Sequence, residues 1–161
     1  MPEVIADTSP IQYLYQTNLL DLLQSLYGRI LIPQAVVEEL SQGCKQGVVL
    51  PDPELISWIE IRKVSTSNLI PMVPNLGLGE REVISLAISL SDSLVILDDA
   101  LARNYALQMN VALTGTLGVL LKAKQSGYIN QISPIVEQLD TLRFRLAPAT
   151  RTAILKLANE A

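Results

Sequence analysis

Carboxylates follow two apolar segments of the sequence, at the point where each segment ends. Asp7 comes directly after Val4–Ala6, and Asp98 and Asp99 come directly after Leu94–Leu97. Short, fully apolar segments are typical of buried strands in a parallel sheet. If the two strands are neighbours, these carboxylates meet at the carboxyl edge of the sheet, where α/β proteins bind ligands. Converging carboxylates repel one another unless a cation neutralises them, so the pattern indicates a divalent metal site.

Two further acidic pairs fit the same edge. Glu38 and Glu39 lie on a predicted helix that follows the strand 29–32, and Glu80 and Glu82 lie in the first turn of another predicted helix. Each of these acidic groups also has a purely structural interpretation. An Asp after a strand caps helices and forms turns, and Glu in a first helical turn complements the helix dipole. The order of the acidic groups along the chain is therefore a stronger indication of a functional site than any single group.

The composition excludes several kinds of chemistry. The chain has no histidine and a single cysteine, Cys44. Histidine acid/base catalysis, histidine-ligated or thiolate zinc sites and an intrachain disulfide are therefore ruled out. Any metal must bind to oxygen ligands, which suit magnesium, manganese or calcium.

The bulk properties predict one soluble domain over residues 1–161. Hydrophobic residues make up 49% of the 161 residues and charged residues 17%, with a net charge of −4 and a pI near 4.8. This is not the broad basic surface of a non-specific nucleic-acid binder. No apolar run reaches the roughly 18 residues needed to span a membrane, and the N-terminus lacks a positively charged signal. We therefore expect a cytoplasmic protein without a membrane partner.

Alternation of strand and helix patterns predicts an α/β fold: a three-layer α/β/α sandwich with a central parallel sheet and right-handed crossovers. A helix capped by Ser9 with Pro10 at its first position, and a second helix capped by Asn18, are expected before the strand 29–32. The remaining predicted strands are 59–64 at an edge, 94–97 and 111–113. The remaining predicted helices are 33–43, 52–58, 79–90, 101–109, 116–126, 132–142 and 148–159, with a loop over 65–78.

Five motifs in order carry a family resemblance: residues 4–10 (VIADTSP), 32–40 (IPQAVVEEL), 77–84 (GLGEREVI), 94–99 (LVILDD) and 114–124 (TGTLGVLLKAK). With these motifs the chain resembles the PIN-domain family, and within it the bacterial and archaeal branch of VapC-like toxins. The resemblance is strongest over residues 3–130. The C-terminal helices, 132–159, lie outside it.

The resemblance implies a ribonuclease that depends on Mg²⁺ or Mn²⁺. It also implies an RNA substrate, a small antitoxin protein as partner, and a homodimer. The family's acidic positions, catalytic and metal-binding, fall on Asp7, Glu39, Glu80 and Asp98, with Asp99 as a further candidate ligand. Glu38 in place of Glu39 and Glu82 in place of Glu80 stay open. Thr8, Ser9 and Thr116 are candidates for orienting water or phosphate, and Arg103, Lys122 and Lys124 are basic residues near the rim that are left out of the site.

The implied chemistry is metal-assisted hydrolysis of a phosphodiester bond. A rival hypothesis is a phosphoryl-transfer or phospho-acceptor α/β domain with Asp7 or Asp98 as nucleophile. Phosphatases that use an Asp-x-Asp motif would need an acid two residues after Asp7, where this chain has Ser9. A third hypothesis is a non-catalytic PIN fold kept for binding.

Overall fold

A five-stranded parallel sheet forms the centre of the molecule. The computed structural model describes residues 2–161, and its strands run in the order β3-β2-β1-β4-β5. They are β1 Glu3–Ala6, β2 Ile30–Pro33, β3 Ile59–Arg62, β4 Ser93–Ile96 and β5 Ala112–Thr114. Because β1 lies between β2 and β4, the apolar residues of these three strands are shielded on both faces and form the middle of the core.

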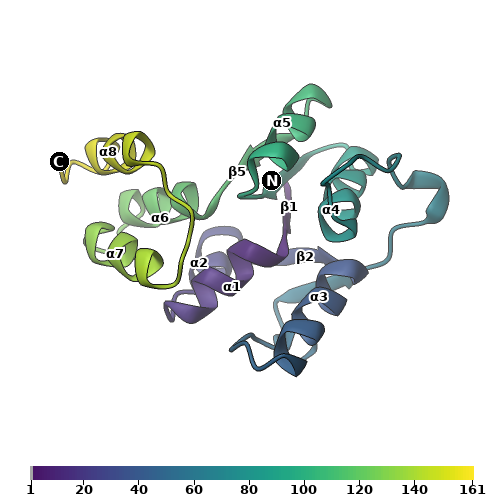
Figure 1. Ribbon diagram of the computed structural model, residues 1–161, viewed down its shortest axis with the longest axis horizontal. Helices are drawn as coiled ribbons and strands as arrows, with labels where there is room; N and C mark the ends of the chain where they lie inside the picture. The colour runs from purple at the N-terminus through teal and green to yellow at the C-terminus, as the bar shows by residue number, and fades with distance from the viewer. Residues whose placement is uncertain (1) are drawn as a thin grey trace.

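Helices flank the sheet and make a three-layer α/β/α sandwich, as the sequence predicts (Figure 1). On one side α4 packs against β1, β2 and β4, and on the other side lie α1, α2 and α6. The α-helices are α1 Thr8–Gln16, α2 Leu22–Tyr27, α3 Gln34–Lys45, α4 Leu78–Ser89, α5 Ala100–Gln108, α6 Thr116–Gln125, α7 Ser133–Thr141 and α8 Pro148–Leu157; two short 3₁₀ turns are Pro53–Leu55 and Thr66–Asn68. Within residues 2–161, no helix has the length and apolar character needed to cross a membrane.

Several predicted helix boundaries are wrong for identifiable reasons. The first helix begins at Thr8 with Asp7 at its N-cap, two residues before the predicted Ser9 cap. Asn18 does not cap a helix: it adopts a left-handed conformation (φ 61°) that ends the first helix, and α2 begins only at Leu22. The third helix runs past Gly43 to Lys45.

The segment 52–58 is also not the predicted helix. It contains only the 3₁₀ turn Pro53–Leu55, capped by the Asp52 side chain, which accepts a hydrogen bond from the Glu54 N–H at 3.1 Å. A proline and a cap start a turn, but too few apolar residues follow at helical spacing to continue it. The expected loop over 65–78 is observed, interrupted by the single turn Thr66–Asn68.

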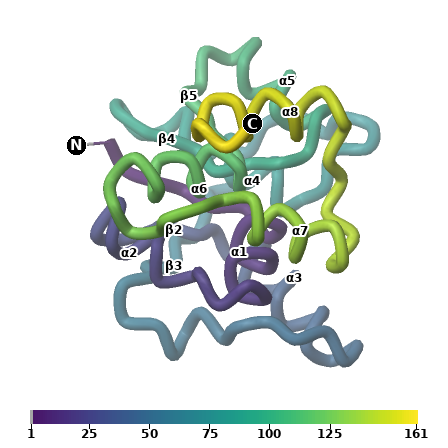
Figure 2. Tube along the Cα trace, turned by 90° about the vertical axis from the view of Figure 1, so that its left-hand side faces the viewer, coloured from purple at the N-terminus to yellow at the C-terminus, as the bar shows by residue number. Residues whose placement is uncertain are grey.

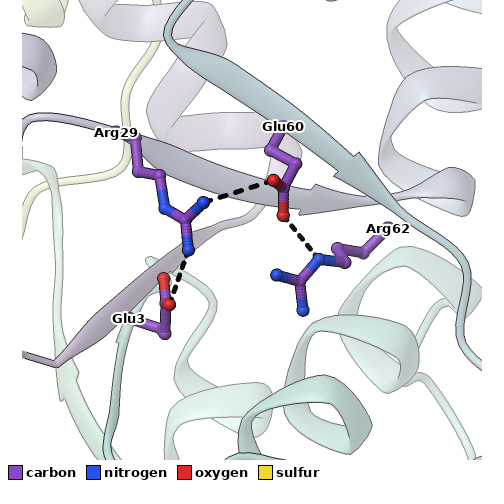
Figure 3. A network of polar contacts seen from close by, with 4 residues as sticks. All are labelled: Glu3, Arg29, Glu60 and Arg62. Atoms are coloured by element: carbon purple, nitrogen blue, oxygen red, sulfur yellow. Dashed lines mark hydrogen bonds and ion pairs between the residues drawn. The ribbon is translucent and has the colours of Figure 1, made fainter.

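A polar network ties together the three strands on one side of the sheet (Figure 3). The Arg29 guanidinium donates to Glu3 at 2.7 Å and to Glu60 at 3.2 Å, and Arg62 pairs with Glu60. Glu3 opens β1, whereas Asp7 follows its last residue, so this network starts from the opposite end of β1 to the acidic residues. Its side chains are between a third and a half exposed, and such ion pairs contribute little to stability.

The last two helices dock through a buried carboxylate near the C-terminus. Figure 2 shows α6, α7 and α8 lying together on one side of the molecule. Glu160 accepts hydrogen bonds from the N–H groups of Ile132 and Ser133, both at 2.9 Å, and pairs with Lys124 at 2.9 Å. Because its side chain is only 7% exposed, Glu160 both caps α7 and neutralises a partly buried lysine of α6.

We expect Glu160→Ala to lower the free energy of unfolding by about 2–4 kcal/mol, because two amide groups lose their acceptor and the Lys124 ammonium keeps only the Ala158 carbonyl. Chemical denaturation monitored by circular dichroism measures the change. Glu137→Ala, on the exposed face of α7, is the matched control and should stay within about 0.5 kcal/mol of the parent. Equal stability of the two variants would show that Glu160 does not hold the C-terminal helices.

Candidate functional site

The sheet order brings Asp7 and Asp98 to the same edge. β1 and β4 are neighbours, with Ala6 in register with Ile96, and the Asp7 N–H donates to the Ile96 carbonyl at 3.0 Å. Asp98 follows β4 two residues later. Its carboxylate accepts hydrogen bonds from the N–H of Thr116 at 2.8 Å and from the Thr116 hydroxyl at 2.6 Å. The first turn of α6 therefore fixes one carboxylate beside the other.

Asp7 is a buried carboxylate, and one of its two oxygens lacks a hydrogen-bond partner. It is 5% exposed, and its Oδ1 has no hydrogen-bond partner among residues 2–161. Burial, together with the negative charges of Glu80, Glu39 and Asp98, raises the pKa of Asp7 to about 8, although a hydrogen bond from the Thr8 backbone acts in the opposite direction. A buried carboxylate that lacks a partner destabilises the fold when it is ionised, so its environment suits a cation.

Helices α3 and α4 carry the two glutamates that act on Asp7. Glu39 accepts from the Thr8 hydroxyl at 2.6 Å and from the Gly79 N–H at 3.1 Å. Glu80 accepts from the Gly77 N–H at 3.0 Å and so completes a capping arrangement at the start of its own helix. Both carboxylates are thus held by the first turn of α4, at the carboxyl edge of the sheet.

The neighbouring glutamates have other roles. The Glu82 carboxylate accepts from the Ala35 N–H at 2.9 Å, in the first turn of α3. Glu39 of α3 in turn binds the first turn of α4, so the two helices cap one another reciprocally. Glu38 is exposed on α3. The structure therefore directs Glu82 into the packing of α3 against α4, and it is Glu39 and Glu80 whose charges reach Asp7.

Asp98 and Asp99 separate in the way that strand geometry demands, because adjacent side chains leave a strand end in opposite directions. Asp99 caps α5, where its carboxylate accepts from the Ala102 N–H at 3.0 Å. It also lies near Glu80: burial raises the pKa of Glu80, and the charge of Asp99 adds to the rise. Burial raises the pKa of Asp98 as well, opposed by the Thr116 hydrogen bonds and the nearby Arg103 cation.

Two glycines make room for these carboxylates. A Cβ atom at Gly79 would lie 2.8 Å from the Glu39 carboxyl carbon, and one at Gly115 would lie 2.8 Å from Asp98 Oδ1. The orphaned Asp7 oxygen and the all-oxygen donor set fit a hard divalent cation. Within the described residues, however, no three acidic side chains are gathered as a finished metal ligand set. The candidate site, here called the acidic pocket, therefore consists of the buried Asp7 and the carboxylates of Glu39, Glu80 and Asp98, which are held by hydrogen bonds.

The threonines and basic residues named from the sequence have mostly structural positions. The hydroxyls of Thr8 and Thr116 orient carboxylates, and Arg103 donates to the Leu97 carbonyl at 2.7 Å. Lys122 lies over the Tyr27 ring, 4.6 Å from its centre, and Lys124 pairs with Glu160.

Sequence reasoning missed one part of the rim. Arg143 and Arg145 line a cavity together with Ser9, Asp98 and Asp99. They lie in residues 142–147, beyond the segment that carries the resemblance, and no spacing in the sequence connects them to Asp98. Only the docking of α7 and α8 brings them there.

Comparison with known proteins identifies the family. A profile described as PIN domain matches residues 3–160, so the chain belongs to the PIN-domain family. Among solved structures, the chain is similar to a PilT N-terminus domain protein from the hyperthermophilic archaeon Sulfolobus solfataricus P2. The TM-score is 0.55 and the identity 23%, over 74% of this chain and 92% of that one, which shows the shared fold. Comparison with curated proteins gives no match. PIN domains are generally nucleases that use divalent metals.

Proposed function

We propose that this chain is a ribonuclease that requires Mg²⁺ or Mn²⁺ and cleaves RNA phosphodiester bonds. The observation that carries the proposal is the buried Asp7 carboxylate, whose Oδ1 has no partner among residues 2–161. Three further carboxylates act electrostatically on it: Glu39, Glu80 and Asp98. A divalent cation bound there would activate water and stabilise the negative charge on the leaving oxygen.

The remaining roles follow from the contacts. Asp7 would be the central ligand, and the carboxylates of Glu39, Glu80 and Asp98 would complete the site, with Asp99 as a fifth candidate. The hydroxyls of Thr8 and Thr116 donate hydrogen bonds to two of these carboxylates, Glu39 and Asp98, and so hold their orientation. With no histidine in the chain, water activation has no imidazole to rely on. A cytoplasmic location, a small antitoxin partner, a homodimer and a toxin role are part of the same proposal.

Metal binding should be visible as thermal stabilisation. At a concentration 100 times its dissociation constant, a ligand of the folded state alone adds about 2.7 kcal/mol of stability. For a chain of this length we expect Mg²⁺ or Mn²⁺ to raise the Tm by roughly 5–10 °C. The measurement is a thermal melt with millimolar metal against the same protein in EDTA. An unchanged Tm would remove the basis for a metal centre.

The non-catalytic PIN fold is the alternative favoured by a specific observation, the lack of a finished ligand set among the described residues. Incubation of the purified chain with single-stranded RNA, in Mn²⁺ and in EDTA, separates the two functions. Cleavage in Mn²⁺ only supports the ribonuclease, and intact RNA in both supports the binding fold. Hydrolysis of a phosphate monoester with the RNA left intact would instead support the phosphoryl-transfer hypothesis.

A further inference from the structure

The loop between α7 and α8 borders the acidic pocket with two arginines. Residues 142–147, here the arginine loop, place Arg143 and Arg145 on the wall of a cavity of about 570 Å³ that Asp98 and Asp99 also line. Arg145 and Asp98 line a second cavity as well, of about 770 Å³, between α5, α6 and α8. The arginine loop therefore stands where the two cavities meet, beside the candidate site.

The backbone of Arg143 is unusual within this chain. Among residues 2–161, five non-glycine residues have a positive φ, and Arg143 (φ 66°) is one of them. The other four are all asparagines: Asn18, Asn75, Asn110 and Asn159. Asparagine tolerates the left-handed region because its short polar side chain bonds locally, whereas arginine has no such advantage. Arg143 is thus the position where the chain places a less suitable residue.

The local hydrogen bonds explain why the backbone of Arg143 is left-handed, but not why this position carries an arginine. Phe144 N–H donates to the Leu139 carbonyl at 2.9 Å, and Arg143 N–H donates to the Asp140 carbonyl at 3.0 Å. These two bonds define a helix C-terminal motif whose left-handed position is most often glycine. Within the described residues, neither Arg143 nor Arg145 forms an ion pair with a carboxylate. The helix C-terminus therefore accounts for the left-handed backbone but not for an arginine at this position, and a residue that is unusual at such a position is a reason to infer a functional role.

Packing anchors the arginine loop between its two arginines. Phe144 contacts Tyr13 of α1 edge to face, with ring centres 5.0 Å apart, so the arginine loop is anchored against the helix that follows Asp7. Phe144 is half-buried while Arg143 and Arg145 on either side are exposed. This alternation presents both arginines to solvent at the mouth of the cavity.

We propose that Arg143 and Arg145 bind backbone phosphates of a single-stranded RNA that passes the acidic pocket. The inference rests on the proposed ribonuclease function and names the residues that position its substrate. A guanidinium group matches phosphate with two parallel N–H donors, and it is the preferred residue for such contacts. On a chain with a net charge of −4, two cations at the rim supply the local attraction that an RNA strand needs beside carboxylates.

The test measures RNA affinity by fluorescence anisotropy, with a labelled single-stranded RNA oligomer and the intact chain carrying Asp7→Asn, so that the RNA is not cleaved. Onto this parent are placed Arg143→Asn, Arg145→Gln, both together, and Arg29→Gln as a charge-matched control in the network of Figure 3. Each loop substitution should weaken binding about 3–10-fold. It should also make the negative slope of log K against log salt shallower by about 0.7, the value for one phosphate contact on a single strand. Arg29→Gln should change neither quantity.

Melting temperature separates binding from structure. Arg143→Asn puts a well-tolerated residue at φ 66°, so its Tm should stay level or rise while its RNA affinity falls. A lower Tm, or an unchanged affinity and salt slope, would overturn the inference. If the parent binds no RNA, both this inference and the ribonuclease proposal fail. If binding depends on the loop arginines but the natural sequence never cleaves RNA with Mg²⁺ or Mn²⁺, the inference stands and the ribonuclease proposal alone falls.

Discussion

Replacement of Asp7 by asparagine is expected to abolish RNA cleavage and, in the metal-free protein, to raise stability. Asn keeps the size of the side chain but removes the charge that would hold a cation. The same charge is costly without metal, because Asp7 is 5% exposed and lies among other carboxylates. Asp7→Asn should therefore lower cleavage by more than about 100-fold, the upper range for loss of a group that only supports a metal ligand.

The stability effect depends on pH in a defined direction. The pKa of Asp7 is raised from 3.8 to about 8 in the folded state. A raised pKa contributes stability that is fully present below pH 3.8 and is lost as pH rises towards 8. At about 1.4 kcal/mol per pKa unit, the full loss corresponds to about 6 kcal/mol. In EDTA, the Tm of Asp7→Asn should thus exceed that of the parent by a margin that widens from pH 4 to pH 8.

The comparison requires thermal melts of both proteins in EDTA across this pH range, together with cleavage assays in Mn²⁺. Addition of metal should raise the Tm of the parent and leave that of Asp7→Asn unchanged. A variant that cleaves as fast as its parent would show that Asp7 is not a metal ligand. A Tm margin that narrows with rising pH would show that the ionised Asp7 carboxylate does not destabilise the metal-free fold.

The second large effect is expected from single charge removals at the other acidic positions. Glu39→Gln, Glu80→Gln and Asp98→Asn should each reduce cleavage by more than about 100-fold. Glu38→Gln should have no effect, because the charge of Glu38 is not among those that raise the pKa of Asp7. Glu82→Gln should also retain activity, because its carboxamide oxygen can still accept the hydrogen bond from the Ala35 N–H.

The helix geometry supplies the reason for these contrasts. Neighbouring side chains on a helix point about 100° apart, so Glu38 and Glu39 cannot both face the pocket. RNA cleavage in Mn²⁺ by the full set of variants, with Asp99→Asn included, tests which acidic residues are needed for activity. An inactive Glu38→Gln beside an active Glu39→Gln would reverse the register of α3. An inactive Asp99→Asn together with an active Asp98→Asn would show that the ligand is Asp99, which caps α5, and not Asp98, which binds Thr116.

The parts of this fold that sequence patterns predict are those dominated by burial. Val4–Ala6 and Leu94–Leu97 are apolar because both faces of the sheet are covered, and the structure places both strands in the sheet within one residue of prediction. Their neighbouring positions bring Asp7 beside the carboxylates that follow β4, as an α/β sheet requires. Hydrophobic periodicity and burial are therefore enough to predict the layers of the fold and the edge of the sheet at which the acidic residues lie.

The predictions that the structure contradicts, and the site features that the sequence did not predict, depend on local backbone conformation or on contacts between distant segments. Asn18 and Ser9 are both residue types that favour N-caps. Asn18 instead adopts a left-handed conformation after the first helix, and Ser9 lies inside that helix, which begins at Thr8. The split between Glu80 and Glu82 depends on a hydrogen bond to Ala35, 47 residues earlier in the chain. Arg143 reaches the pocket only through the docking of the C-terminal helices, which no motif near Asp98 encodes.

The central claim is that the acidic pocket around Asp7 holds a divalent cation, and diffraction from crystals grown in Mn²⁺ tests it most directly. We predict an anomalous manganese peak within coordination distance of Asp7 Oδ1, contacted by at least one of Glu39, Glu80 and Asp98, and lost in Asp7→Asn. No peak at Asp7 with millimolar Mn²⁺ present, or a peak that persists unchanged in Asp7→Asn, would contradict the account.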